Sequence, residues 1–145
     1  MATYTHGYHE SVLRSHRWRT AQNSAAYLLP HLTATDRLLD VGAGAGTITV
    51  DLARIVADVT ATEFGAEGLE LTRSTVAAQG VANIQLEVAD IHALPFDDAI
   101  FDVAHAHQVL QHVADPVQAL REMARVTRPG GIVAVRASDY SGFNW

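Results

Sequence analysis

The sequence predicts an α/β protein with a doubly wound parallel sheet of about five strands. Short β-rich runs alternate with segments of helical periodicity along most of the 145 residues, and parallel neighbouring strands need such crossover helices. A glycine-rich turn also joins the first run to the first of these helices, as it does at the ligand-binding edge of many doubly wound sheets. We therefore expect helices on both faces of the sheet.

The first half of this pattern begins with a helical segment. Apolar residues recur at helical intervals between Ser11 and Leu32 and end near Pro30, so residues 1–32 are predicted to form an N-terminal cap on a core of residues 33–145, within one domain. The apolar run 37–41 predicts a buried strand, and the repeat from Ile48 to Val56 predicts a helix. The β-rich run 58–63 predicts a second strand, and a second helix is expected to end at Gly80.

Three further strands are expected in the second half, at 84–88, 100–104 and 132–136. A helix between the last two should begin at Pro116, which suits a first turn, after Asp115, which can cap it. The triplet 129–131, Pro-Gly-Gly, is expected to stop this helix, and the tail 137–145 reads as irregular.

Composition restricts the function. Hydrophobic residues make up 48% and charged residues 18%, as in globular proteins. The absence of cysteine excludes disulfides, thiolate ligands and a cysteine nucleophile. A net charge of −6 with scattered arginines argues against a nucleic-acid partner. The sequence has no apolar run long enough for a membrane span and no signal-peptide core near its start, which predicts a soluble, cytoplasmic protein.

The glycine turn, Asp40-Val-Gly42-Ala-Gly44-Ala-Gly46, is the strongest functional signal. Glycines that lack side chains let the backbone approach a ligand closely. A merely tight turn would need one glycine rather than three alternating ones. A dinucleotide site of the G-x-G-x-x-G type would need its last glycine at position 47, which is Thr47, so the spacing disfavours a nicotinamide cofactor.

With this turn, most of the chain resembles the class I S-adenosylmethionine-dependent methyltransferases, which have a Rossmann-like fold. The nearest look-alikes are the enzymes of ubiquinone and menaquinone biosynthesis. Ala43 and Ala45 depart from the pattern, since many relatives carry cysteine and proline there. The matching motifs follow the family's order: Asp40 with Gly42, Gly44 and Gly46, then Glu63, Ala89-Asp90-Ile91, Leu94-Pro95-Phe96, Phe101-Asp102-Val103, and Arg125 to Gly131.

The resemblance implies a site for S-adenosylmethionine. Glu63 lies near the spacing at which an acidic residue accepts hydrogen bonds from ribose hydroxyls; the alternative is a solvated carboxylate. By resemblance Asp90 accepts from the adenine amino group and Ile91 packs on the ring, although Asp90 could be only a turn residue. Asp40 either meets the cofactor's amino-acid part, through water or the loop backbone, or only supports the turn. The remaining expected contacts are Gly42, Ala43, Gly44, Gly46, Thr47, Phe64 and His107.

The implied reaction is methyl transfer to a small-molecule acceptor. If the acceptor must lose a proton, His112 or His107 is the candidate base, with a structural role for His112 as the alternative. A metal site formed by these two and His105 is not expected, because paired carboxylates at ligand spacing are missing. Aromatic residues of the cap could close over the cofactor, or pack on the sheet and leave the first residues disordered: Tyr4, Tyr8, His9 and Trp18.

Two other function classes remain open at this point, a non-catalytic or truncated cofactor-binding module and, less favoured, a nicotinamide-dependent oxidoreductase. The family's sheet usually has seven strands, and the last two are not expected here. The strand at 132–136 would then be an apolar edge able to pair with a second copy. The tail adds three aromatics to this side: Tyr140, Phe143 and Trp145.

Overall fold

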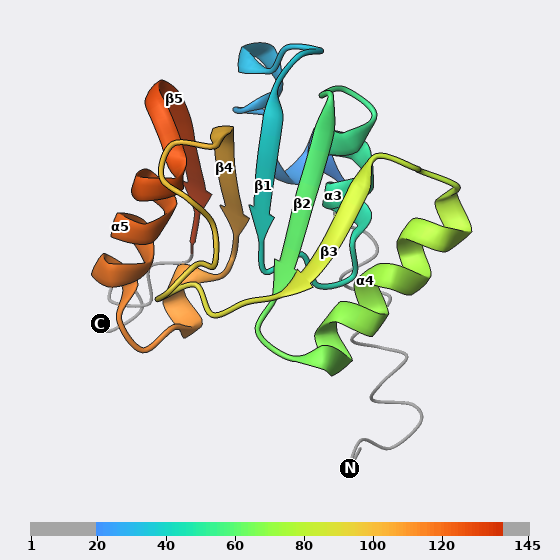
Figure 1. Cartoon of the computed structure of the whole chain (residues 1–145). Coiled ribbons are helices and arrows are strands. Elements are labelled where there is room, and N and C mark those ends of the chain that lie inside the picture. The colour runs from blue at the N-terminus through green and yellow to red at the C-terminus, as the bar shows by residue number, and fades with distance from the viewer. Residues whose placement is uncertain (1–19, 138–145) are drawn as a thin grey trace, which may run out of the picture.

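The computed structural model describes residues 20–137 and contains a five-stranded parallel sheet with helices against it (Figure 1). The order across the sheet is β3-β2-β1-β4-β5, which confirms the doubly wound prediction. The proposed lid residues (Tyr4, Tyr8, His9, Trp18) and tail aromatics (Tyr140, Phe143, Trp145) lie outside the described range. The strands are β1 (Arg37–Val41), β2 (Asp58–Glu63), β3 (Ile84–Val88), β4 (Phe101–His107) and β5 (Thr127–Arg136).

The strand order reverses between β1 and β4. From β1 the chain winds outward through β2 to β3, then crosses to the other side of β1 to form β4 and β5. Ligands of such sheets bind beyond the carboxyl ends of the strands at this switch in order. Asp40 of β1 is paired in register with His105 of β4 at the switch.

Alternation along the strands sends side chains into two cores. Leu38 of β1 and Val103 of β4 pack on the face covered by α2 (Ala21–Ser24) and α3 (Thr47–Ala53), where α4 (Ala66–Gln79) also lies. Leu39 and Ala104 pack on the opposite face, against α5 (Pro116–Val126). Helices therefore cover both faces of the sheet, and β1 and β4 each contribute to both cores.

Two helix ends follow from local chemistry, as the sequence predicts. Gly80 ends α4 in the left-handed conformation, at φ 65°, which glycine adopts without a steric penalty. Asp115 caps α5, and its side chain accepts from the Gln118 N–H at 3.1 Å, while Pro116 occupies the first turn.

The helical prediction for residues 11–32 is confirmed only in part over residues 20–32, where α2 is short. After α2, only Leu29–His31 form a single 3₁₀ turn, η1. Ala25 leaves the helix at φ −131°, and both Ala25 and Leu28 are buried in the core. Pro30 has no N–H to continue a helical ladder. Packing against the sheet therefore decides this segment, rather than its periodicity.

The fifth strand begins earlier than predicted, because β5 starts at Thr127, directly after α5 ends at Val126. The Pro-Gly-Gly triplet lies inside β5, at a register shift opposite Phe101 to Val103. A Cβ on Gly131 would come within 2.6 Å of the Asp102 carbonyl oxygen, so glycine permits this close approach. The fourth strand extends beyond the apolar run 100–104 and ends at His107.

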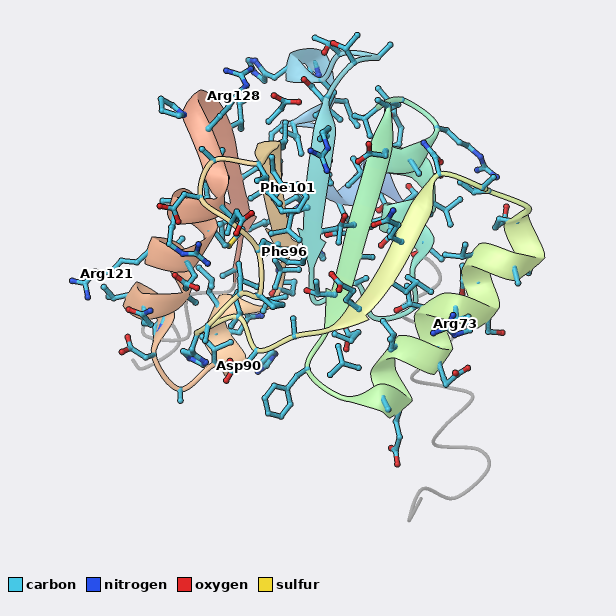
Figure 2. The ribbon with its side chains drawn as sticks, viewed as in Figure 1. Arg73, Asp90, Phe96, Phe101, Arg121 and Arg128 are labelled. Carbon is cyan, nitrogen blue, oxygen red and sulfur yellow. The ribbon has the colours of Figure 1, made fainter. Side chains whose placement is uncertain are left out.

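Several of the family-like motifs stabilise the fold at a distance from the switch. Arg125 of α5 donates to the carbonyl oxygens of Leu94 and Phe96, at 2.9 and 2.8 Å. The Phe96 ring packs edge-on against Phe101, with centroids 5.3 Å apart. Figure 2 shows Arg128 and Asp90 at opposite ends of the sheet. Across residues 20–137, the helices are all too short or too polar to cross a membrane.

Candidate functional site

The glycine loop between β1 and α3 needs glycine for its backbone conformation. Gly42, Gly44 and Gly46 have φ angles of 70°, 57° and 82°, in the left-handed region that other residues rarely adopt. The N–H groups of Gly42 and Ala43 donate to the carbonyl oxygen of Thr62, at 2.9 and 3.1 Å. The loop is therefore bent over the end of β2 and fixed there.

The room for a side chain differs between Gly42 and Gly44. A Cβ on Gly42 would come 2.5 Å from a methyl group of Val109. A Cβ on Gly44 would meet nothing closer than 3.9 Å, and Gly44 lines a pocket. Gly42 thus permits packing within the protein, whereas Gly44 leaves room that a ligand can use.

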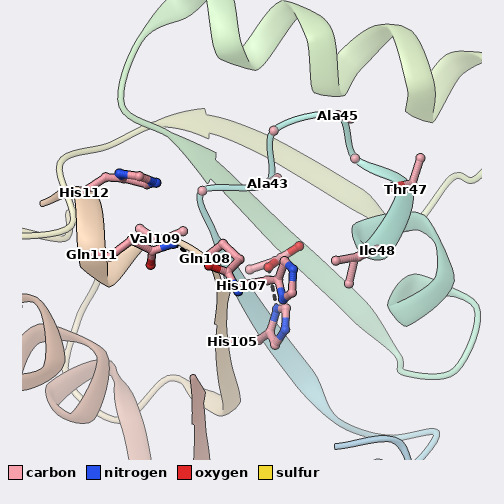
Figure 3. Close-up of a pocket in the computed structure, with 14 residues that line it drawn as sticks. Ala43, Ala45, Thr47, Ile48, His105, His107, Gln108, Val109, Gln111 and His112 are labelled. Carbon is pink, nitrogen blue, oxygen red and sulfur yellow. Dashed lines mark hydrogen bonds and ion pairs between the residues drawn. The ribbon is translucent and has the colours of Figure 1, made fainter. Parts of the chain in front are cut away.

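Two pockets meet at the carboxyl ends of the strands. The first, here called the glycine-loop pocket, has a volume of about 390 Å³ and lies between the loop and the end of β4 (Figure 3). The second, the β2–β3 pocket, has a volume of about 460 Å³ and lies beyond the ends of those strands. An elongated ligand could occupy both, because they share four lining residues: Gly42, Gln108, Val109 and His112.

The structure brings every predicted cofactor residue to one of the two pockets. Those at the β2–β3 pocket are Glu63, Phe64, Asp90 and Ile91. Those at the glycine-loop pocket are Asp40, Gly42, Ala43, Gly44, Gly46, Thr47 and His107. Their position is as expected; their contacts with a ligand stay a prediction.

Glu63 is half-buried at the end of β2, and one carboxylate oxygen accepts from the Gly44 N–H at 2.7 Å. Burial raises the pKa of Glu63, the Gly44 N–H opposes this, and the charge of Asp40 adds to the rise. The other oxygen lies directly over Gly68 of α4, whose missing side chain leaves room for it. The sequence pattern did not single out Gly68.

Asp90 follows β3 and is exposed. Its Oδ1 accepts from the backbone N–H of His92, at 2.9 Å, and contacts the His92 Nδ1 at 2.7 Å. These bonds lower the pKa of Asp90 and so favour its ionised form. The His92 Nε2 lies 3.1 Å from the Asp115 N–H. His92, which sequence reasoning missed, therefore links the predicted adenine site to the start of α5.

Asp40 holds two elements together, which fits the supporting role considered for it. It is 3% exposed, and its Oδ2 accepts from the Thr49 hydroxyl of α3 at 2.6 Å. Its Oδ1 lies 2.8 Å from Nδ1 of His105. Sequence reasoning missed the role of His105, although alternation along β4 places it on the same face as His107.

The two candidate bases lie at the pocket walls. His107 is the last residue of β4 and is half-buried, and Figure 3 shows it beside His105. His112 is exposed and belongs to a 3₁₀ turn, η2 (Leu110–His112), rather than to a longer helix. Within the described range no three histidine, aspartate or glutamate side chains are grouped as metal ligands would be.

Residues 39–135 match a family whose description is "Methyltransferase domain". The chain belongs to the methyltransferase domain family.

Other members of this family are similar over much of the chain. An uncharacterized methyltransferase of Schizosaccharomyces pombe is 38% identical over 144 residues, which cover 94% of this chain and 52% of the relative. A ubiquinone/menaquinone biosynthesis C-methyltransferase of Bdellovibrio bacteriovorus is 40% identical over 104 residues, or 70% of this chain and 44% of the relative. The chain thus spans about half the length of the curated relatives it matches.

A solved structure shows the same fold. The phosphoethanolamine N-methyltransferase 1 of Haemonchus contortus, in complex with phosphoethanolamine and S-adenosylhomocysteine, matches with a TM-score of 0.68 and 25% identity. The match covers 77% of this methyltransferase domain and 24% of that chain. The predicted class I fold and the resemblance to quinone-biosynthesis methyltransferases are confirmed.

Proposed function

We propose that this methyltransferase domain binds S-adenosylmethionine across the two pockets and transfers its methyl group to a small-molecule acceptor. The observation that carries the proposal is the joint geometry of the glycine loop and Glu63. The loop turns three left-handed residues toward the strand ends. The N–H of Gly44, which lines the glycine-loop pocket, donates to the carboxylate of Glu63, which lines the β2–β3 pocket. The relatives that match are themselves named methyltransferases.

The residues present fit the cofactor in an extended form. Glu63 would accept from the ribose hydroxyls, and Asp90 from the adenine amino group. Ile91 and the exposed ring of Phe64 would enclose the base, since both line the β2–β3 pocket. The amino-acid part would then occupy the glycine-loop pocket, where the backbone can approach it closely. The junction at Gly42 and Val109 would receive the sulfur.

The bound cofactor would supply an activated methyl group on a sulfonium. The protein would orient the acceptor in line with the methyl–sulfur bond and exclude water from it. His112 lines both pockets and His107 lines the first, so either imidazole could take the acceptor's proton at a ring nitrogen. The acceptor atom would form the new bond to carbon as the electron pair of the broken bond passes to sulfur.

We propose a cytoplasmic enzyme that takes a small molecule and not a nucleic acid, since the net charge is −6. Self-association through the outer edge of β5 is also proposed, because β5 pairs only with β4 in the described sheet.

Calorimetry with S-adenosylhomocysteine and with NAD tests the binding step. S-adenosylhomocysteine should bind and NAD should not; binding of NAD alone would overturn the proposal. Turnover is then measured with S-adenosylmethionine and a panel of quinols, phenols and amines. Binding without transfer to any acceptor would support the non-catalytic module instead.

A further inference from the structure

A buried acid–imidazole pair lies at the floor of the glycine-loop pocket. Asp40 and His105 are register partners on β1 and β4, and they are 3% and 1% exposed. The His105 Nδ1 lies 2.8 Å from one Asp40 oxygen, and the Thr49 hydroxyl donates to the other at 2.6 Å. Both residues line the pocket, and Figure 3 shows the His105 ring there.

The hydrogen bonds determine what this pair offers to a ligand. An ionised carboxylate can only accept, so the His105 Nδ1 donates to Asp40. In the neutral ring, Nε2 then carries the free lone pair. This Nε2 is buried and has no hydrogen-bond partner among the described residues. Because a buried acceptor without a partner keeps its desolvation penalty, a ligand donor at this atom would relieve a penalty in the free protein.

The charge of the pocket indicates the kind of donor. Asp40 supplies a negative charge, and no arginine or lysine is among the residues that line the pocket. An ammonium group carries three N–H donors and a positive charge. Such a group could donate to Nε2 while its charge interacts with the Asp40 carboxylate through the ring, in a site of low exposure where electrostatic interactions are stronger.

We propose that His105, oriented by Asp40, receives the α-ammonium group of the cofactor's amino-acid part through Nε2. This inference rests on the proposed function and assigns a residue that the sequence motifs did not. Asp40 acts as the positioning residue, since it fixes the ring's tautomer and orientation. His105 is the binding residue, and it distinguishes ligands that carry the amino group from ligands that lack it.

The test pairs two ligands with variants of His105. S-adenosylhomocysteine is compared by calorimetry with its deaminated analogue, which lacks only the α-amino group. The unmodified protein should bind S-adenosylhomocysteine at least about tenfold more tightly, as expected for a hydrogen bond to a charged group. In His105→Asn the side-chain amide can still donate to Asp40, but nothing replaces Nε2. This variant should lose the tenfold preference by weakening S-adenosylhomocysteine binding alone.

Two further variants sharpen the result. His105→Gln can place its carbonyl oxygen near the position of Nε2 and should recover part of the preference. His31→Asn changes an exposed histidine of η1 that lines neither pocket and should keep all of it. Thermal unfolding of each variant verifies that the comparison is made on folded protein.

Three outcomes would overturn the role of His105, and a fourth would contradict the proposed function. An unmodified protein that binds both ligands equally well overturns the inference, even if no His105 variant folds. Equal weakening of both ligands by His105→Asn also overturns it, as does a lower kcat with unchanged binding, which would indicate a role toward the acceptor. Failure of the unmodified protein to bind either ligand would instead contradict the proposed function.

Discussion

Gly44 is the residue where backbone conformation and ligand space are needed together. Its φ is 57°, and a side chain there would extend into the glycine-loop pocket without meeting the protein. We expect Gly44→Val to abolish S-adenosylhomocysteine binding in calorimetry while the sheet stays folded by circular dichroism. Because valine is strained in the left-handed conformation, the substitution should also lower the free energy of unfolding by about 1–2 kcal/mol.

Gly80 offers a matched control for Gly44. It has a φ of 65°, nothing lies within 4 Å of its Cβ position, and it ends α4 away from both pockets. Gly80→Val should therefore lose similar stability and keep full ligand binding. If Gly44→Val also keeps full binding, the loop does not hold the cofactor as proposed.

Glu63 should make ligand binding depend on pH. Burial raises its pKa, and a protonated carboxyl is a poorer acceptor for two ribose hydroxyls. S-adenosylhomocysteine binding should therefore weaken as the pH falls through this raised pKa, at values where an ordinary glutamate is still ionised. Calorimetry at a series of pH values measures this change in affinity. Glu63→Gln should bind about tenfold more weakly at neutral pH and should lose this part of the pH dependence; an unchanged profile would contradict the assignment.

The raised pKa of Glu63 has the opposite effect on the pH dependence of folding stability. The pKa of Glu63 is higher in the folded state than in the unfolded state, so the native state binds protons more readily. The free energy of unfolding contributed by this group is therefore lost as the pH rises through the raised pKa. Glu63→Gln should accordingly be no less stable than the unmodified protein at neutral pH, as thermal unfolding would show.

Individual site residues could be predicted from the sequence where their function depends on residues close to them along the chain. The three alternating glycines and Glu63 follow recognisable strands, and the structure places them at the pockets. The bond between Asp40 and His105 joins residues 65 positions apart. It depends on β1 and β4 being adjacent and in register, which the alternation of elements implies only in outline.

Among the elements, α4 supports the site through its first turns. Gly68 lets the Glu63 carboxylate lie against the helix, and the Thr72 hydroxyl donates to the Gly44 carbonyl oxygen at 2.6 Å. A methyl group on Gly68 would displace the Glu63 carboxylate. We expect Gly68→Ala to weaken S-adenosylhomocysteine binding by about tenfold, the value of one lost charge-assisted hydrogen bond.

Gly65 is the control for this helix, since its Cβ position has nothing within 4 Å and its φ is −127°. Gly65→Ala should leave binding unchanged in the same titration. Equal binding by the Gly68 and Gly65 variants would show that Glu63 can be accommodated elsewhere.

Element boundaries failed where tertiary contacts override local signals. The triplet at 129–131 contains residues that normally stop a helix and was not expected in a strand. It forms an irregular part of β5, which begins at Thr127 rather than at 132. Gly131 is required there by its approach to the Asp102 carbonyl oxygen. That requirement comes from a neighbouring strand, so it cannot be seen in the periodicity of apolar residues around Gly131.

At the scale of the whole molecule, Arg128 and the predicted adenine-binding residue Asp90 lie at opposite ends of the sheet (Figure 2), so we expect stability at one end to be separable from binding at the other. Asp102, at the amino end of β4, accepts from the Arg37 N–H at 2.8 Å and pairs with Arg128. The Arg37 N–H and then Arg128 lower the pKa of Asp102, so its stabilising effect is present at neutral pH and is lost as the pH falls through the folded-state pKa.

Asp102→Ala should lower the free energy of unfolding by about 1–3 kcal/mol in denaturant titrations. Unchanged S-adenosylhomocysteine binding is expected, and a loss of binding by the folded variant would contradict this separation.

The outer edge of β5 has no neighbouring strand in the described sheet. This strand runs ten residues, pairs with β4 alone in the described sheet, and has Val133 39% exposed. Exposed apolar edges tend to pair with another chain, so the protein should form dimers whose fraction grows with concentration in multi-angle light scattering. Val133→Lys places a charge on that edge and should shift the equilibrium to monomer, whereas Val133→Thr keeps the β-branched shape and should leave more dimer. A strictly monomeric, soluble protein up to high micromolar concentration would contradict the prediction, because the edge of β5 would then have to be shielded within one chain.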